Sequence, residues 1–335
     1  MDYMRKIFHI CLSSHEEVMF RTEADFVRGF NCLAETALLT ESRLLADGLL
    51  STHWHTVVQT DDPDNFVRRY RYSYARYFNS THSRQGRLGE RKAFVTEIDG
   101  IHRLTTAISY VNRQGLHHGL TATPFGYPHC SVNAYYRREL GKDSMDCALM
   151  PAGCRHQFLT RNVRIPESYR MAKNGLLLRE DILDTSYVEQ VYLTPRNFLF
   201  QMNKLTDERI MEEQKSEKSS TPVISIDLIE QGTPDFNIKQ MLVNEQGRVN
   251  KSWMTDQDLC RLIDSYYIPR LKGEGSPATV YSLSPIERSR LFETMKRDLR
   301  QARFSDKNDG RTLVGSAGLA GQFVTEPQLR RCLVV

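Results

Sequence analysis

Two histidines one residue apart lie in an apolar segment of the chain, where His53 and His55 flank Trp54. A β-strand alternates its faces, so both imidazoles would project from one face while Trp54 packs on the other. Two imidazoles placed in this way can share one divalent metal ion. The same pattern also fits two histidines on a half-buried strand that are satisfied by hydrogen bonds. The spacing therefore leaves a metal site and a purely structural pair as alternatives.

A second pair of chemically competent residues lies on a helix predicted over residues 100–114. Apolar side chains recur there every three or four residues, which is typical of an amphipathic helix: Ile101, Leu104, Ile108 and Val111. Tyr110 and Gln114 are four residues apart and share one face. A tyrosine can attack a phosphodiester that a metal ion polarises, and a glutamine carbonyl one turn away can complete the metal site. An ordinary surface tyrosine would give the same spacing.

Between these motifs, the segment from Phe66 to Lys92 is strongly basic and rich in tyrosine, with Glu90 as its single acid. Basic side chains neutralise phosphates, and aromatic faces stack on unpaired bases. An amphipathic helix with core aromatics and solvated arginines fits equally, and we expect some tyrosines to pack inward and the basic groups to face DNA. The predicted DNA-binding residues are Arg68, Arg69, Arg71, Arg76, Arg84, Arg87, Arg91 and Lys92.

As an ordered set, these motifs resemble the HUH single-tyrosine transposases, which carry His-hydrophobic-His on a strand and then a helix with Tyr-x-x-x-Gln. The stretch from Tyr70 to Asn79 resembles that group's helix ending in Tyr-Ala-x-Tyr-Phe-Asn, and Ser83 to Gly89 resembles its Arg-x-Gly segment. Tyr110 to Gln114 stands where REP-associated tyrosine transposases carry Tyr-Ile-x-x-Asn-Pro. Tyr127 to Tyr136 is similar to their Tyr-x-x-Ser-Ser-Tyr close. The resemblance covers roughly residues 4–138.

The sequence departs from this family in three places. Leu50-Ser51-Thr52 replaces the usual Met-Pro-Asn, Gln114-Gly115 replaces Asn-Pro, and a long C-terminal part carries no motif of the family. Glutamine is the residue found in insertion-sequence transposases of the same superfamily, so the resemblance still implies a metal-ligand role for Gln114.

The residue patterns predict an α+β fold. Strands are expected at 6–12, 44–59 and 94–96, with 94–96 in a hairpin over 84–98, and helices at 23–40, 64–78 and 100–114. The resemblance implies that residues 1–145 form an HUH nuclease domain with a ferredoxin-like or RRM-like antiparallel sheet. His53 and His55 would lie on a central strand facing the tyrosine helix.

Residues 146–335 are expected to form a mixed, largely helical extension of unknown role, with DNA binding as one candidate. Residues 212–220 are charged and poor in apolar side chains, which is typical of an exposed loop or linker. Helices are predicted at 255–271 and 285–301, and the second is basic, with either a DNA contact or a solvated face as its role. Residues 305–335 are Gly-rich and basic, as in a mobile tail.

The function implied by the resemblance is a metal-dependent single-strand DNA transposase or endonuclease that cleaves and rejoins DNA next to hairpins formed by palindromic repeats. His53, His55 and Gln114 would hold Mg²⁺ or Mn²⁺, and Tyr110 would form a 5′-phosphotyrosine intermediate. The chain has no Gly-x-x-x-x-Gly-Lys-Ser/Thr loop for ATP. The alternatives are an HUH replication or mobilisation nickase, a DNA-hairpin-binding regulator without cleavage, and a non-catalytic metal-binding structural protein.

Composition is that of a globular protein, with a mild net charge of +4 and seven scattered cysteines in 335 residues. No signal peptide is recognisable, and no apolar run approaches the length of a membrane helix. We therefore expect a reduced, soluble, cytoplasmic protein associated with the nucleoid. The long C-terminal part favours a monomer over a homodimer.

Overall fold

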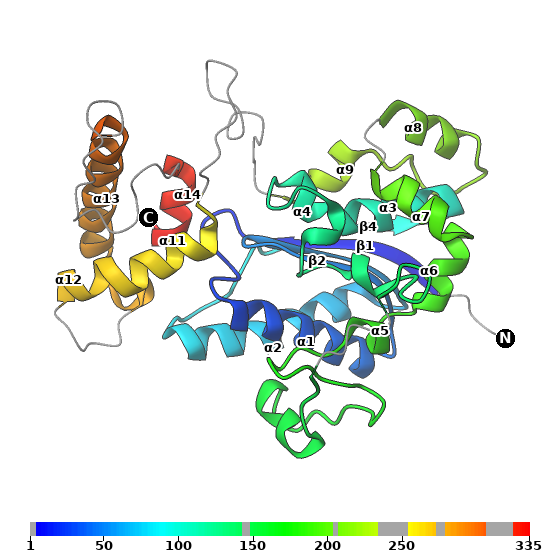
Figure 1. The fold of residues 1–335 in the computed structure, drawn as a ribbon, viewed down its shortest axis with the longest axis horizontal. Helices are drawn as coiled ribbons and strands as arrows, with labels where there is room; N and C mark the ends of the chain where they lie inside the picture. Colours follow the sequence, from blue (N-terminus) through cyan, green and yellow to red (C-terminus); the bar gives the residue numbers. More distant parts are fainter. Residues whose placement is uncertain (1–4, 143–147, 204–206, 234–253, 273–278, 306–323) are drawn as a thin grey trace.

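The computed structural model describes residues 5–142, 148–203, 207–233, 254–272, 279–305 and 324–335. The N-terminal part is an α+β unit (Figure 1). Its first six elements are β1 (Lys6–Ser13), α1 (Glu23–Leu39), β2 (Arg43–Leu49), β3 (His53–Thr60), α2 (Pro63–His82) and β4 (Phe94–Ile98).

The four strands form one sheet in the order β2-β3-β1-β4, with every neighbouring pair antiparallel. This order with a β-α-β-β-α-β chain path is the ferredoxin-like topology. Helices α1 and α2 cover one face, and α3 (Ile101–Asn112) with α4 (Gln114–His117) covers the other (Figure 1). The predicted α+β class with an antiparallel sheet is confirmed, and β3 is a central strand that faces α3.

The single histidine strand predicted over residues 44–59 is wrong, because that stretch is the β2-β3 hairpin. The chain turns between the two strands, where the Leu50 amide donates to the carbonyl of His53 at 2.8 Å. Both strands are buried almost throughout, so their sequences read as one continuous apolar run. In the hairpin predicted over residues 84–98, only β4 is a strand. Gly86 and Gly89 have φ values of 92° and 75°, which are incompatible with extended backbone.

Local sequence signals explain where α1 and α2, the two helices that cover one face of the sheet, begin. Helix α1 starts at a capping box in which Thr22 and Asp25 satisfy each other's backbone amides. Helix α2 starts after Asp62, whose side chain accepts from the Asn65 amide. The aromatic residues of α2 pack inward as expected: Tyr70 lies with its ring centroid 4.5 Å from that of Trp54.

Helix α3 approaches the sheet closely over β2, and Gly48 makes that approach possible. A Cβ atom at this position would lie 2.8 Å from the carbonyl oxygen of Val111. Ser131 connects the same two elements, since its hydroxyl accepts from the Asp47 amide at 3.0 Å and donates to the Asn112 side chain at 2.7 Å. These contacts fix the distance between the helix and the strands beneath it.

The rest of the described chain is largely helical, as predicted. Its elements are η1 (Pro124–Gly126), η2 (Ser131–Ala134), η3 (Ala152–Phe158), α5 (Arg179–Ile182), α6 (Thr185–Tyr192), α7 (Pro195–Asn203), α8 (Asp207–Lys215), α9 (Ile226–Glu230), α11 (Asp256–Leu262), the π-helical η4 (Ile263–Tyr267), α12 (Ile268–Lys272), η5 (Val280–Ser282), α13 (Pro285–Ser305) and α14 (Glu326–Leu333). None of the helices in the described ranges has both the length and the apolar character needed to cross a membrane.

Two hydrophobic clusters form the core of the described part of the chain. The first extends from the sheet to side chains between Met171 and Ile229, beyond the predicted domain boundary between residues 145 and 146. The second joins Val18 to α11, α13 and α14, which lie together at one end of the molecule (Figure 1). The predicted tail is therefore wrong for its last part, because α14 is a packed helix whose Cys332 and Leu333 are buried. Residues 306–323 of that predicted tail lie outside the described ranges.

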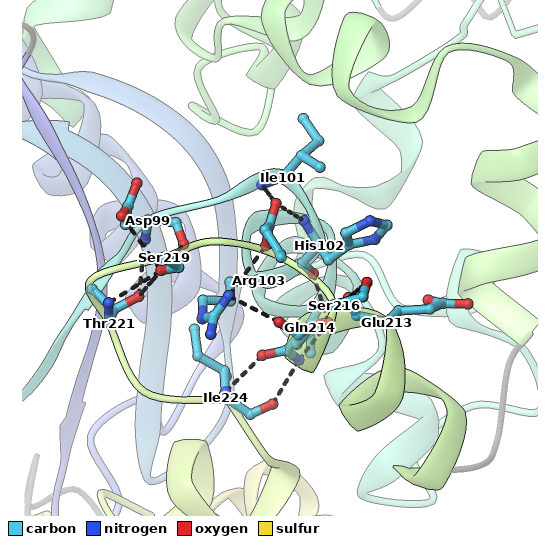
Figure 2. A network of polar contacts seen from close by, with 12 residues as sticks. Asp99, Ile101, His102, Arg103, Glu213, Gln214, Ser216, Ser219, Thr221 and Ile224 are labelled. Carbon is cyan, nitrogen blue, oxygen red and sulfur yellow. Dashed lines mark hydrogen bonds and ion pairs between the residues drawn. The ribbon is translucent and has the colours of Figure 1, made fainter.

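Residues 212–220, predicted as an exposed loop or linker, are exposed at several positions, but the segment is docked against α3 instead of being free. The buried Gln214 exchanges two hydrogen bonds with the backbone of Ile224, and Arg103 of α3 donates to the carbonyl of Gln214 (Figure 2). Arg103 also donates to the carbonyl of Pro222. The Glu217 carboxylate accepts from the first amides of α3 and pairs with Arg103. A charged segment is docked here because its charges meet a helix N-terminus and a buried arginine.

Candidate active site

Three buried polar atoms without a hydrogen-bond partner converge between β3 and α3. They are Nε2 of His53, Nε2 of His55 and the phenolic oxygen of Tyr110. The ring centroids of His53 and His55 are 5.0 Å apart, and those of His55 and Tyr110 are 5.3 Å apart. Leaving such groups unsatisfied costs free energy, so their convergence indicates a place for a ligand or metal ion.

The other ring nitrogen of each histidine is engaged. Nδ1 of His53 lies 3.0 Å from the Thr52 hydroxyl, and Nδ1 of His55 lies 3.0 Å from Nε2 of His9 on β1. Partners of this kind orient metal-ligating imidazoles and select the tautomer that offers the remaining nitrogen. Nε2 is therefore the ring nitrogen that each histidine leaves for a ligand.

Gln114 is the first residue of α4 and follows Tyr110 by four residues; the single helix predicted over residues 100–114 is interrupted at Arg113, because α3 ends at Asn112. The amide nitrogen of Gln114 donates to the carbonyl of Tyr110 at 3.3 Å, and its amide oxygen lies 3.2 Å from Nε2 of His118. No group of three or more His, Cys, Asp or Glu suited to a metal ion occurs in the described ranges. The predicted ligand set is thus two imidazoles and one amide oxygen, which fits a metal ion that keeps several waters.

Burial keeps these histidines neutral. It lowers the pKa of His53 and of His9 to about 3. It also lowers the pKa values of His55 and His118 well below 6.5, with their histidine neighbours acting in the same direction. Neutral imidazoles have the lone pair that a metal ion requires, so the rings are in the ligand form at neutral pH.

Tyr110 is only 7% exposed. Burial, and secondly the carboxylate of Glu230, raise the pKa of Tyr110 well above 10. Glu230 belongs to α9, and its carboxylate lies 2.7 Å from Nε2 of His117. The phenol is therefore protonated at neutral pH, and its deprotonation needs a compensating positive charge.

Two cavities adjoin the group. One of about 840 Å³ is lined by Tyr110, His117 and Glu230, and one of about 290 Å³ is lined by His53, His118 and Arg331. The second cavity lies between the sheet unit and α14, so the C-terminal helices help to enclose the histidine end of the site.

Six of the eight predicted DNA-binding residues line one groove of about 930 Å³ between α2 and the segment before β4: Arg68, Arg71, Arg76, Arg87, Arg91 and Lys92. Arg69 lies instead on a separate cavity of about 1110 Å³ beside α1. Arg84 is committed to the structure, because its guanidinium pairs with the Glu17 carboxylate and both side chains are nearly buried. On the basic helix α13, Lys296 pairs with Glu326 and Arg288 donates to the carbonyl of Val334.

Four further residues at the site were not identified from the sequence: His9, His117, His118 and Glu230. His9 lies on the predicted first strand, and His118 follows Gln114 by four residues, which is the spacing of one helical turn. The strand position of His9 and the spacing of His118 were therefore visible in the sequence. No sequence pattern pointed to Glu230, because α9 reaches the site only through the docking of the preceding segment, residues 212–220, against α3.

No protein-family model matches the chain, and no curated protein is similar to it. Among solved structures, the chain is similar to one described as a REP-associated tyrosine transposase bound to a REP hairpin. That similarity has a TM-score of 0.35 and 9% sequence identity, and it covers 42% of this chain and 84% of the other.

Proposed function

We propose that this protein is a metal-dependent single-strand DNA endonuclease and strand transferase of the transposase type, with Tyr110 as its nucleophile. His53, His55 and Gln114 hold Mg²⁺ or Mn²⁺, and the basic groove beside α2 binds the hairpin of the DNA substrate. The observation that carries the proposal is the convergence of three buried, unpartnered atoms, Nε2 of His53, Nε2 of His55 and Oη of Tyr110.

The donor set fits a divalent metal ion. Both imidazoles are neutral, and Thr52 and His9 engage their Nδ1 atoms, which leaves Nε2 of each ring for a metal ion. A metal ion bound there supplies Lewis-acid polarisation of a phosphate oxygen and a positive charge near the phenol. The amide of Gln114 is held on both sides, because its nitrogen donates to the Tyr110 carbonyl and its oxygen lies 3.2 Å from Nε2 of His118.

In the reaction, Oη of Tyr110 attacks phosphorus and forms a 5′-phosphotyrosine bond while the bond from phosphorus to the 3′ oxygen breaks. The phenol loses one proton and the departing 3′ oxygen gains one, so that a free 3′ hydroxyl results. The buried position of Tyr110 limits hydrolysis of the covalent intermediate by water. Attack by a 3′ hydroxyl on the phosphotyrosine rejoins strands and conserves the bond energy, so no ATP is required.

The test is a denaturing gel with labelled, hairpin-bearing single-stranded DNA and Mn²⁺. The wild-type protein should give a covalent band, and Tyr110→Phe and His53→Ala should give none. Tyr192→Phe is the matched control, because this buried tyrosine hydrogen-bonds to Ser109, is not among the residues that line the cavity beside Tyr110, and should leave the band unchanged.

A covalent band from Tyr110→Phe at the wild-type level would overturn the proposal. Binding of hairpin DNA by the wild-type protein without a covalent band would favour a regulator that does not cleave. A covalent product whose strands are never rejoined would favour a replication or mobilisation nickase.

A further inference from the structure

Arg331 is a buried cation for which the described residues supply no counter-ion. It lies in the last turn of α14 and is only 9% exposed. Its Nε atom has no hydrogen-bond partner, and no ion pair joins its guanidinium to another residue of the described ranges. Enclosing an unpaired guanidinium lowers stability unless an anion occupies the space beside it.

The space beside Arg331 is the cavity of about 290 Å³ that also contains His53 and His118. Two carboxylates line the same cavity, but each is engaged elsewhere. Asp256 accepts from the Ser51 hydroxyl at 2.6 Å, and Glu23 pairs with His129 at 3.3 Å. The guanidinium is therefore the group in this cavity that remains available for an incoming anion.

We propose that Arg331 binds a phosphate group of the DNA backbone at the His53 end of the site. This inference rests on the proposed function, because it places the phosphate in the cavity that adjoins the candidate metal ligands. A guanidinium presents a planar fork of N–H donors that matches two phosphate oxygens. Arg331 is thus a positioning residue, and it assigns to the C-terminal extension a direct part in holding the substrate.

The neighbouring Arg330 provides a matched control. It belongs to the same helical turn and carries the same charge, but it pairs with Glu326 at 2.9 Å and stacks over the ring of Phe292 at 4.5 Å. Substituting Arg330 changes the net charge equally without touching the cavity. A general electrostatic effect would therefore appear in both variants, and a site effect only in the Arg331 variant.

The first measurement uses the full-length protein and inorganic phosphate as the probe, with thermal unfolding followed in phosphate and in chloride at equal ionic strength. Phosphate should raise the Tm of the wild type and of Arg330→Gln by roughly 2 °C or more, because a ligand that binds only the folded state stabilises it. Arg331→Gln should lose this rise, and Arg331→Lys should keep part of it. In chloride, the Tm of Arg331→Gln should equal or exceed that of the wild type, because an unpaired buried charge has been removed.

The second measurement is the affinity for hairpin-bearing single-stranded DNA at several salt concentrations. Arg331→Gln should weaken binding about tenfold and reduce the salt slope by about 0.7, the contribution of one single-strand phosphate. A loss of the phosphate effect without any change in DNA binding would overturn the DNA assignment and leave free phosphate as the ligand.

A phosphate effect retained by Arg331→Gln, or a Tm in chloride well below the wild type, would overturn the anion site and assign Arg331 a structural role at the helix C-terminus. The denaturing gel for the covalent adduct tests the nuclease function independently of these two measurements. If the wild type forms no adduct while both Arg331 effects appear, the nuclease function fails and the phosphate site stands. If the adduct forms and neither Arg331 effect appears, the nuclease function stands and the phosphate site at Arg331 fails.

Discussion

Nε2 of His9 lies 3.0 Å from Nδ1 of His55, so a histidine of β1 orients a histidine of the neighbouring strand β3. When His9 accepts the proton of His55 Nδ1, the Nε2 atom of His55 keeps its lone pair. That atom has no partner, and the ring of His55 lies with its centroid 5.3 Å from that of Tyr110. His9, for which the sequence predicted no role, thus fixes the tautomer and orientation of His55, one of the candidate metal ligands.

Removing this partner should weaken metal binding. His9→Ala is expected to reduce the affinity for Mn²⁺ by about 10- to 100-fold, the usual cost of losing an orienting partner. His9→Gln should retain most of the affinity, since its amide oxygen can accept near the position of Nε2. Titration calorimetry of both variants measures this, and equal affinity of His9→Ala and wild type would show that His55 needs no orienting partner.

The hydroxyl of Tyr110 should contribute nothing to stability. It is buried without a partner, so Tyr110→Phe should leave the free energy of unfolding unchanged or slightly higher. Tyr192→Phe should lower it by about 1 kcal/mol or more, because the Tyr192 hydroxyl bonds to Ser109 at 2.8 Å and donates to the Thr105 carbonyl at 3.3 Å. Urea unfolding compares the two variants, and a clear loss of stability in Tyr110→Phe would reveal a structural bond.

Mild acid should destabilise the metal-free protein through its buried histidines. The pKa of His9 falls from 6.5 to about 3 on folding because burial disfavours the imidazolium. Between these values the unfolded chain binds more protons, so stability is full above pH 6.5 and is lost as the pH falls toward 3. His9 alone should cost about 2 kcal/mol between pH 7 and pH 5. Urea midpoints in EDTA test this, and His9→Gln should flatten the pH dependence.

The docked segment should stabilise α3 through Glu217. Glu217→Ala removes the acceptor for the amides of Ile101 and His102 and leaves Arg103 without its carboxylate. We expect a loss of roughly 2 kcal/mol and faster amide exchange in the first turn of α3. Lys218→Ala, at an exposed neighbouring position, should change neither quantity. Unchanged exchange in Glu217→Ala would mean that this segment does not hold the helix.

The basic residues around α2 should fall into two classes, those that bind DNA and those that stabilise the fold. Arg91 is exposed and lines the groove, so Arg91→Gln should reduce the salt slope of DNA binding by about 0.7 to 1 without affecting the fold. Arg84 pairs with Glu17 in a nearly buried position, so Arg84→Gln should cost roughly 2–4 kcal/mol of stability. Salt-dependent binding and urea unfolding of both variants check the division, and identical behaviour of the two would contradict it.

The sequence by itself determined the local elements and the faces of the main site residues. Period-two alternation placed His53 and His55 on one face of β3 and Trp54 on the other. Four-residue spacing brought Gln114 next to Tyr110, although α3 ends at Asn112 and Gln114 begins α4. These relations depend only on strand and helix geometry. The β2-β3 turn was missed because both strands are buried and the apolar run hides the boundary.

Only the tertiary structure decided which distant residues surround that site. His9 reaches His55 through antiparallel strand pairing, Glu230 reaches His117 through the docked segment, and Arg331 reaches the His53 cavity through the packing of α14. The same packing turned Arg84 from a predicted DNA ligand into the partner of Glu17. Such contacts depend on how layers and helices pack, and a local pattern of residue types carries no information about which buried charge will meet which partner.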